Sequence, residues 1–455
     1  MTRSPVGPAR GEAVRVRSSR ASADDGATVA LDDALLSGLA PDGGLYLPDR
    51  VPPLPDDWDA ADGIGDLAAR TLAPWWGDEA SEVAPLLRDA LSFPVPLRPI
   101  SDGTYLLELF HGPTLAFKDV GARVMARLVS RALARRGGRA TVLVATSGDT
   151  GSAVADGFAG VANVRVALLY PRGLVSDVQE RQLTASRPNV RPFAVEGDFD
   201  ACQRLVKAAF RDRDLQEVGL TSANSINVGR LLPQATYYLW ADALARRDHG
   251  VREPLRFVVP SGNLGNLTAG LLAHDAGLPV ARFLAAHNAN RYLPDVLAGR
   301  RDRDQVAPTV RTVSNAMDVG APSNAERLWA RYGDRLRDHV DALSIDEAAT
   351  YARMWRTWRE EGVQVCPHTA VGLEALVRWR AAGEIGPAIV LATAHPAKFP
   401  AAFARATGSA PEPAEALEAL RDVPTTVEPL VANDAALKRA LLDDAGWSRV
   451  RTERA

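Results

Sequence analysis

The amino-acid sequence predicts an α/β protein with two parallel-sheet lobes. Short apolar runs recur from residue 140 onward, and most precede a helical segment; they cover residues 141–145, 164–169, 190–195, 257–260, 280–285 and 388–392. Brief apolar strands that alternate with helices are typical of a parallel sheet covered on both faces. Such a sheet binds ligands at the carboxyl ends of its strands. Three of these runs end in polar motifs, so we expect the functional site there.

The spacing of the runs favours two α/β lobes of unequal size and an N-terminal lobe. We expect residues 1–98 to form the N-terminal lobe, with a helical and loop-like pattern from residue 30 to about residue 96. Residues 99–139 and 221–410 are assigned to a large lobe, and residues 140–220 to a smaller, mobile lobe. Residues 411–455 begin with a proline-rich linker and are predicted to be a helical tail. At 455 residues the chain is long enough for about three domains of ordinary size.

Charge and composition argue against several classes of function. The formal net charge is −3 and 24% of residues are charged, which gives no basic field for nucleic acid. No apolar run approaches the roughly 20 residues of a membrane span, and no signal peptide is visible. We therefore expect a cytoplasmic protein with neither a nucleic-acid nor a membrane partner. Cys202 and Cys366 lack zinc-ligand spacing and the histidines are scattered, so we predict no metal site.

One lysine lies where an enzyme could use it as a nucleophile. Lys118 follows a Gly-Pro turn and the apolar residues 115–117, at the start of a helical segment. Desolvation and the positive end of a helix both disfavour a charged amine, so this lysine can be held in its neutral form. The usual product of such an amine is a Schiff base, most often with pyridoxal phosphate. An ion pair with Asp119 is the alternative interpretation.

Two glycine-rich turns compete for the phosphate of such a cofactor. They are Ser147-Gly148-Asp149-Thr150-Gly151-Ser152 and Ser261-Gly262-Asn263-Leu264-Gly265-Asn266, and neither is a dinucleotide fingerprint or a P-loop. The carboxylate of Asp149 would repel a phosphate dianion, whereas the second turn offers only neutral groups. We therefore assign the cofactor phosphate to Gly262, Asn263, Leu264, Gly265 and Asn266. Ser147, Asp149 and Thr150 are then candidates for substrate binding, with a plain strand-to-helix turn as the alternative.

A third polar segment spans residues 224–230. It gathers hydroxyl, amide and guanidinium groups within seven residues. This combination fits a phosphoryl group better than an acyl group, because arginine offers a planar fork of donors to phosphate oxygens. A capped helix start with a surface arginine is the alternative.

Taken together, these motifs resemble the threonine synthases, a family of pyridoxal-phosphate enzymes. The matching segments follow the family order at residues 111–119, 147–152, 224–230, 261–266, 314–318 and 393–399. An N-terminal Asp42-Gly43-Gly44-Leu45-Tyr46-Leu47-Pro48 matches the longer branch of the family, found in fungi and many bacteria. The likeness extends from about residue 15 to about residue 407, and six ordered motifs are far more specific than any one of them.

The resemblance implies a fold and a set of site residues. The implied fold is that of pyridoxal-phosphate fold type II, similar to the tryptophan synthase β chain, with a cleft between a large and a smaller lobe. Lys118 would be the catalytic residue that carries the cofactor, and the Thr393 hydroxyl would face its ring nitrogen. Without the family, Thr393 reads as a strand-end cap. Ser225, Asn227 and Arg230 would hold the substrate phosphate, and the role of Lys398 stays open.

The implied reaction converts O-phospho-L-homoserine and water into L-threonine and phosphate, as a carbon–oxygen lyase would. The alternatives are a related fold type II enzyme acting on another amino acid with a β or γ leaving group, and a cofactor-binding paralogue without turnover. His287, Arg291 and Cys366 depart from the usual threonine, aspartate and acidic residue of the family. Whether they change the substrate stays open. We expect a small-molecule substrate and a monomer or homodimer.

Overall fold

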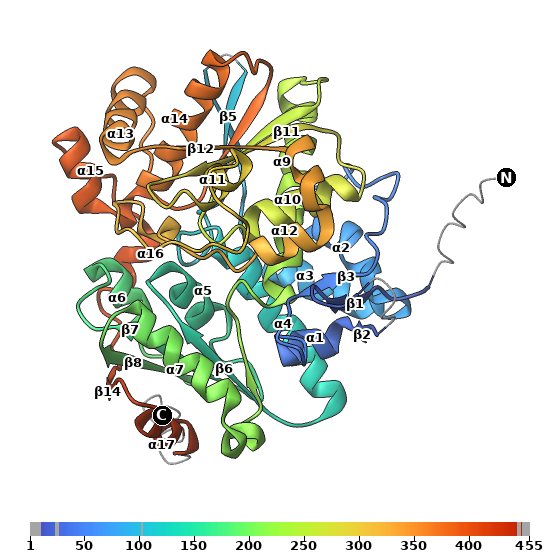
Figure 1. Ribbon diagram of the computed structural model, residues 1–455, viewed down its shortest axis with the longest axis vertical. Helices are drawn as coiled ribbons and strands as arrows, with labels where there is room; N and C mark the ends of the chain where they lie inside the picture. Colours follow the sequence, from blue (N-terminus) through green and yellow to red (C-terminus); the bar gives the residue numbers. More distant parts are fainter. Residues whose placement is uncertain (1–10, 23–26, 102, 444–446, 448–455) are drawn as a thin grey trace.

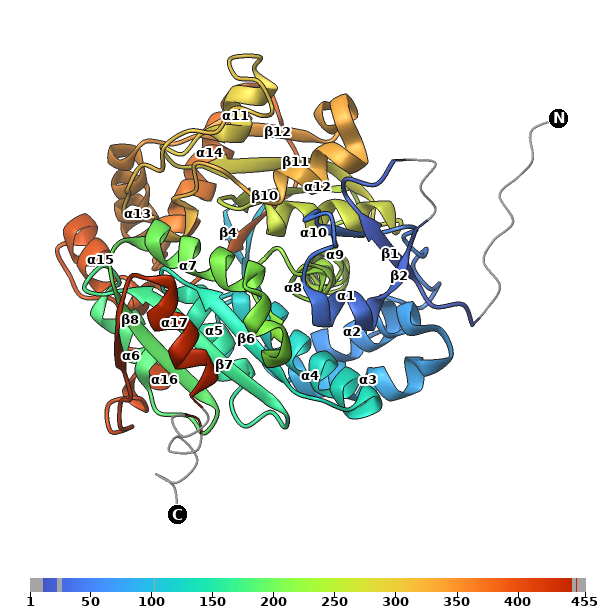
Figure 2. The same cartoon turned by 60° about the horizontal axis from the view of Figure 1, so that its bottom comes forward.

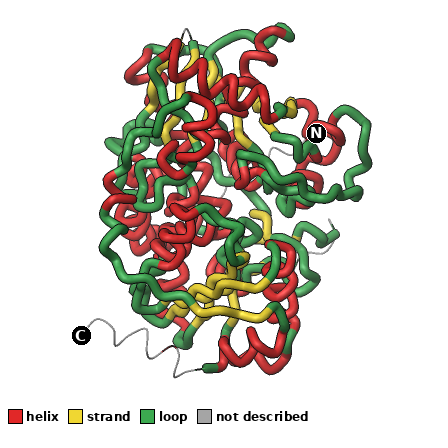
Figure 3. The backbone as a smooth tube through the Cα atoms, turned by 90° about the vertical axis from the view of Figure 1, so that its left-hand side faces the viewer, coloured by secondary structure: helices red, strands yellow, loops and turns green. Residues whose placement is uncertain are grey.

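The computed structural model describes residues 11–22, 27–101, 103–443 and 447, and contains two parallel-sheet lobes with a third lobe at the N-terminal side (Figure 1). Figure 3 shows the strands of the two larger sheets as separate groups at opposite ends of the molecule. The prediction of two α/β lobes is therefore confirmed. Among the described helices, none is both long and apolar enough to cross a membrane.

The large lobe is built on a six-stranded sheet in which only the edge strand β4 is antiparallel. Its strands, in spatial order, are β12 (Val340–Ser344), β11 (Val280–His287), β10 (Leu255–Pro260), β13 (Ala388–Ala392), β5 (Thr104–Glu108) and β4 (Leu97–Ser101). Its main helices are α4 (Lys118–Arg136), α8 (Val228–Leu231), α9 (Ala235–His249), α10 (Gly265–Asp275), α11 (Tyr292–Leu297), α12 (Ala325–Tyr332), α13 (Glu347–Glu361), α14 (Pro367–Ala381) and α15 (Pro400–Thr407). The 3-10 turns η3 (Leu232–Gln234), η4 (Asn315–Met317), η5 (Gly333–Asp338) and η6 (Pro396–Lys398) connect them.

Both faces of this sheet are buried, which explains its nearly continuous apolar strands. Along β10, Phe257 and Val259 join the core that contains α9 and α10, whereas Val258 joins a second core that contains α14. Side chains that alternate along a strand point to opposite faces, so each face has its own layer of helices. The sequence missed β4, β5 and β12 because no helical segment separates the first two and because polar residues interrupt the third.

The small lobe has a five-stranded parallel sheet. Its strands are β14 (Glu428–Val431), β8 (Val190–Glu196), β7 (Val164–Pro171), β6 (Ala140–Ala145) and β9 (Leu220–Thr221), and its helices are α5 (Asp149–Gly157), α6 (Asp177–Thr184), α7 (Phe199–Arg211) and η2 (Arg213–Val218). The boundary predicted between residues 220 and 221 falls inside β9. The exact domain limits remain a prediction.

The predicted helical tail is in part a strand. Residues 411–443 contain α16 (Glu415–Glu418), the edge strand β14 and α17 (Asp434–Leu442), which packs on α7 (Figure 2). Arg191 of β8 is buried and pairs with Glu428 of β14 at 2.7 Å. The tail therefore belongs to the small lobe, although it follows the large lobe in the chain. Most residues after 443 lie outside the described part of the tail.

The N-terminal lobe combines helices with a small antiparallel sheet. Its elements are β1 (Arg15–Ser18), β2 (Val29–Ala30), α1 (Leu31–Ser37), β3 (Tyr46–Pro48), α2 (Ile64–Thr71), η1 (Ala73–Glu79) and α3 (Ala80–Ala90). The prediction of helices and loops alone was wrong, because these strands are too short to show an alternating pattern. Trp76 is buried and donates to Asp32 at 2.8 Å, and the lobe packs against α4, α8 and α9.

We expect Leu437→Ala to lower the free energy of unfolding of the small lobe. Leu437 is 1% exposed in the core that α17 shares with α7, so its truncation should cost about 2–5 kcal/mol. Leu442→Ala is the matched control on the same helix, since Leu442 is 49% exposed and should change the free energy of unfolding by less than about 0.5 kcal/mol. Urea unfolding followed by tryptophan fluorescence measures both. Equal effects of the two variants would show that the tail does not share the core of the small lobe.

Candidate active site

The lysine motif and the end of β13 lie against each other. The Phe117 amide donates to the Thr393 carbonyl at 2.9 Å, and Ala116 forms an isolated antiparallel bridge with Ala394. Thr393 is buried, and its hydroxyl makes no hydrogen bond to any described residue. These contacts put Thr393 next to Lys118, as the resemblance implies, and leave a hydroxyl available there.

Lys118 is an unpaired amine at the start of α4. Its side chain is only partly exposed, and its amine makes no hydrogen bond or ion pair with the described residues. Burial lowers its pKa to about 8; the charges of Arg230 and Lys398 act in the same direction, while Asp149 opposes them. The Asp119 carboxylate instead accepts from the amide and hydroxyl of Thr114 at 2.9 and 2.5 Å. The interpretation of Lys118 as an ion-pair partner of Asp119 is therefore wrong.

The turn at residues 261–266 suits a phosphate group. Leu264 has a left-handed φ of +61° and is the N-cap of α10, whose first turn has no side-chain cap. Uncapped amides at the start of a helix are donors for an anion. The side-chain oxygen Oδ1 of Asn266 accepts from the hydroxyls of Tyr237 and Tyr238 at 2.6 and 2.7 Å, and these bonds hold the turn in place. This cradle fits the phosphate of the cofactor that the sequence predicts.

The other glycine-rich turn uses its amides internally. The Thr146 hydroxyl accepts from the amides of Gly148 and Gly151 at 3.0 and 2.8 Å. This inward closure agrees with the assignment of the phosphate to the second turn. Ser147 and Thr150 are half-buried, and their hydroxyls have no partner among the described residues. They remain candidates for substrate binding.

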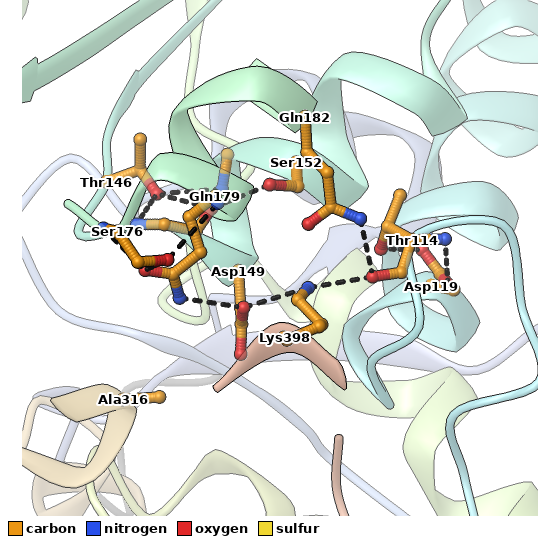
Figure 4. A network of polar contacts seen from close by, with 12 residues as sticks. Thr114, Asp119, Thr146, Asp149, Ser152, Ser176, Gln179, Gln182, Ala316 and Lys398 are labelled. Atoms are coloured by element: carbon orange, nitrogen blue, oxygen red, sulfur yellow. Dashed lines mark hydrogen bonds and ion pairs between the residues drawn. The ribbon is translucent and has the colours of Figure 1, made fainter. Parts of the chain in front are cut away.

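A buried ion pair joins the large and the small lobe at the site. The Lys398 amine is fully buried and lies 2.9 Å from Asp149 on the small lobe, and 2.7 Å from the Thr114 carbonyl on the large lobe (Figure 4). Gln179 also donates to Asp149, and Gln182 to the Thr114 carbonyl, each at 3.1 Å. Burial acts to raise the pKa of Asp149, but the charges of Lys398 and Lys118 outweigh it and hold the pKa below its usual range.

The pairing gives Lys398 the role that the sequence left open. Asp149 uses its Oδ1 for Lys398 and Gln179, and its assignment to substrate binding stays a prediction. The signal in the sequence was a single lysine flanked by Ala397 and Phe399, since a lysine in apolar surroundings needs an anion once it is buried.

Arg230 is a buried cation without a bonded carboxylate. It is 3% exposed, one of its terminal nitrogens donates to the Ala223 carbonyl at 2.6 Å, and its Nε has no partner among the described residues. Burial lowers its pKa to about 10. The alternative of a surface arginine is therefore wrong. An unbalanced guanidinium in a desolvated place is suited to an anion.

The two other residues assigned to the substrate phosphate bond mainly to the protein. The side-chain oxygen Oδ1 of Asn227 accepts from the Gly229 amide at 2.8 Å, and its side-chain nitrogen Nδ2 donates to the carbonyls of Leu35 and Ser222 at 3.0 and 2.9 Å. This leaves Asn227 no free group for a ligand, so it supports the segment from within. The Ser225 hydroxyl accepts from Asn263 at 2.5 Å and links the segment to the cofactor turn.

The departures from the family pattern lie in different surroundings. Arg291 is exposed and pairs with Asp295 at 2.9 Å, so it has a local role on the surface. Cys366 is buried at the N-cap of α14, with Sγ 3.3 Å from the Thr369 hydroxyl. His287 is buried at the end of β11, close to the Asn290 carbonyl, and burial lowers its pKa to about 4. Among the described residues, no group of three or more potential ligands could hold a metal ion.

We expect Gly262→Ala to impair cofactor retention far more than Gly265→Ala. A Cβ at Gly262 would lie 2.8 Å from the Met317 Cα and 3.0 Å from the Ala316 carbonyl oxygen, so the backbone of the turn would have to move. At Gly265 the nearest atom is the side-chain nitrogen of Asn324 at 3.3 Å, which can shift slightly. Cofactor content after gel filtration, read from absorbance, checks this. Equal retention in both variants would contradict the assigned seat.

The low pKa of Lys118 predicts how cofactor-free protein takes up pyridoxal phosphate. Only the neutral amine attacks a carbonyl, so the uptake rate should rise with pH through a midpoint near 8 rather than near 10.5. Asp149→Asn removes a negative charge that raises this pKa, so the midpoint should move to lower pH. Stopped-flow absorbance measures the rate. A midpoint that moves upward in the variant would reverse the assigned electrostatics.

Comparison with known proteins agrees with the fold and the motifs. Residues 95–394 match the family model "Pyridoxal-phosphate dependent enzyme", residues 16–84 match "Threonine synthase N terminus", and residues 369–441 match "Threonine synthase, C-terminal". Threonine synthase of Haemophilus influenzae is 40% identical over 91% of this chain and 96% of its own length.

Two solved structures support the same relationship. PLP-bound threonine synthase from Brucella melitensis superposes with a TM-score of 0.86 at 33% identity, over 94% of this chain and 99% of that one. Threonine synthase from yeast gives 0.85 at 30% identity, over 96% and 99% of the two chains. The predicted fold type II and the predicted cofactor are thereby confirmed. The chain belongs to the threonine synthase family of pyridoxal-phosphate-dependent enzymes.

Proposed function

We propose that this enzyme converts O-phospho-L-homoserine and water into L-threonine and phosphate, as a carbon–oxygen lyase acting on a phosphate ester. The observation that carries the proposal is that two groups without a bonded carboxylate, the Lys118 amine and the Arg230 guanidinium, belong to the same site. One is an unpaired amine with a lowered pKa, and the other is a buried guanidinium whose charge acts on that amine. A nucleophile beside an unbalanced cation fits an amino-acid substrate with a dianionic leaving group.

The residues that would hold the cofactor are Lys118, the amides of the turn at 262–266 and the Thr393 hydroxyl. When bound, pyridoxal phosphate withdraws electrons from the substrate carbons next to its amino group. A hydroxyl at Thr393 can hydrogen-bond the ring nitrogen, but it cannot strongly stabilise a charged ring as a carboxylate would. The turn that would hold the cofactor phosphate offers only neutral donors, so the Arg230 guanidinium stays available to bind the substrate.

The chain's own groups then move protons and hold the leaving group. The Lys118 amine takes the proton from the substrate Cα, and we assign the deprotonation at Cβ to the same amine. Arg230 and the Ser225 hydroxyl hold the phosphoryl group as its bond to Cγ breaks, because charge-assisted donors bind the departing dianion most strongly. Water finally adds at Cβ, which gives the hydroxyl of the product, while the two protons taken from Cα and Cβ return to Cα and to Cγ, which becomes the methyl group. The remaining proton of the water balances the one that the released phosphate takes up.

The contact between the lobes controls when water can reach the substrate. The ion pair between Lys398 and Asp149 crosses from the large to the small lobe and is fully buried on the lysine side. Its formation requires the lobes to be closed, and a closed site excludes water before phosphate has left. Water must enter afterwards, so we infer that this pair opens and closes during turnover.

The decisive experiment compares leaving groups in the wild type and in Arg230→Met. Wild-type protein should release phosphate and L-threonine in equal amounts from O-phosphohomoserine and react far more slowly with O-acetylhomoserine or O-phosphoserine. Loss of a charge-assisted contact costs about 1.5–3 kcal/mol, so Arg230→Met should lower kcat/KM for the phosphate ester by about tenfold to a hundredfold. Bound cofactor should be retained.

Arg291→Met is the control for the same experiment. This arginine is paired on the surface, so its replacement should leave kcat/KM within about twofold. Comparable turnover of the acetyl ester by the wild type would refute the phosphate specificity and favour a lyase for another amino acid. Absence of turnover with all three substrates would favour a binding protein.

A further inference from the structure

The largest fully buried side chain of the described residues is a second arginine, Arg327 on α12. It makes no ion pair with a described carboxylate; the neighbouring Glu326 is bonded to Arg20 and Ser19 of the N-terminal lobe. Its donors go to oxygen atoms of uncharged groups. They reach the carbonyls of Tyr46, Ser225 and Ile226 at 3.0, 3.0 and 2.6 Å and the side-chain oxygen of Asn324 at 2.5 Å.

These bonds fix the orientation of the phosphate-binding segment. Arg327 holds two consecutive carbonyls, those of Ser225 and Ile226, on the same side. In a planar trans peptide the N–H points opposite to the carbonyl, so the Ile226 N–H points away from Arg327. That N–H makes no hydrogen bond to any described residue, and Ile226 is only half-buried. It is therefore an oriented donor without a partner, one residue after the Ser225 hydroxyl.

The same segment is supported by the N-terminal lobe. The Tyr46 carbonyl of β3 accepts from Arg327, and the Leu35 carbonyl of α1 accepts from Asn227. A Cβ at Gly229 would lie only 2.2 Å from the Leu35 side chain, so the lobe and the segment are packed closely. The N-terminal lobe thus supports the segment through hydrogen bonds to Arg327 and Asn227 and through the packing of Leu35, without supplying a polar side chain of its own.

We propose that Arg327 is a positioning residue for the substrate's phosphoryl group, and that the Ile226 N–H it orients is a further phosphate donor. The inference rests on the proposed function, because it names new groups for the same subsite. The buried guanidinium polarises the two peptides whose carbonyls it holds, and its uncompensated charge favours a dianion on their other side. Loss of the Arg327 guanidinium should therefore weaken phosphate binding more than cofactor binding, because the cofactor phosphate site lies at the start of α10.

The experiment measures binding of inorganic phosphate to the holoenzyme by calorimetry, with kcat and KM for O-phosphohomoserine measured in parallel. Arg327→Met should weaken phosphate binding tenfold or more and raise KM more than it lowers kcat, with cofactor content unchanged. Arg327→Lys keeps the charge but cannot hold three carbonyls, so it should lose about threefold to tenfold. Arg331→Met, one turn later on α12 and paired with Asp275, is the matched control and should stay within about twofold.

Hydrogen exchange gives a readout that a purely structural role would not move. Phosphate should slow exchange in the peptide containing Ile226 in the wild type, and this protection should be lost in Arg327→Met. Phosphate affinity and protection within twofold of the wild type in both Arg327 variants would overturn the proposal. If Arg327→Met does not fold, Arg327→Lys decides. A wild type that neither binds phosphate nor uses the phosphate ester would instead refute the proposed function.

Discussion

Burial of positive charge that the protein does not fully neutralise is the constraint on which the rest of this site depends. Of the cations around this site, the partly buried Lys118 and the buried Arg230 and Arg327 have no bonded carboxylate among the described residues, whereas Lys398 is paired with Asp149. Keeping such groups charged away from water costs free energy unless hydrogen bonds or an anion compensate. Backbone carbonyls compensate the arginines in part. The remaining deficit is what an anionic cofactor and an anionic substrate can supply.

Each lobe contributes to this arrangement in a different way. The large lobe provides the carboxyl ends of β10 and β13, where the phosphate cradle and Thr393 lie. The small lobe provides Asp149, and besides the packing of α5 on α4 it is linked to the large lobe at the site by the buried ion pair with Lys398 and by Gln182. The N-terminal lobe provides the backbone carbonyls of Leu35 and Tyr46 and the packing of the Leu35 side chain, and these hold the segment that carries Arg230. Closure of the lobes, which pairs Lys398 with Asp149, and binding of the anions thus both compensate the buried positive charge of the site.

Much of the fold and of the site could be predicted from local patterns. The parallel strands β6, β7, β8, β10, β11 and β13 could be predicted because both of their faces are buried, which makes them nearly continuously apolar. The phosphate-binding turn at residues 261–266 could be predicted because a phosphate site needs consecutive backbone amides, which small neutral residues supply within one turn. The edge strands β4, β9 and β14 were not visible, since edge strands are short and partly polar. Their place in a sheet is decided by the neighbouring strand rather than by their own sequence.

Local sequence was enough to predict the class of chemistry, because a lysine at a helix start, a neutral glycine-rich turn and an arginine-containing segment follow the order of a known family. Tertiary structure alone decided which of these groups are free. In the folded protein, Asn227 and Asp149 bond to residues of other lobes, whereas the Lys118 amine has no bonded partner among the described residues. Tertiary structure also brought in Lys398 and Arg327, which lie far along the chain from the groups they contact. Such pairings depend on contacts between distant segments, and these arise only when the apolar faces of the lobes pack together.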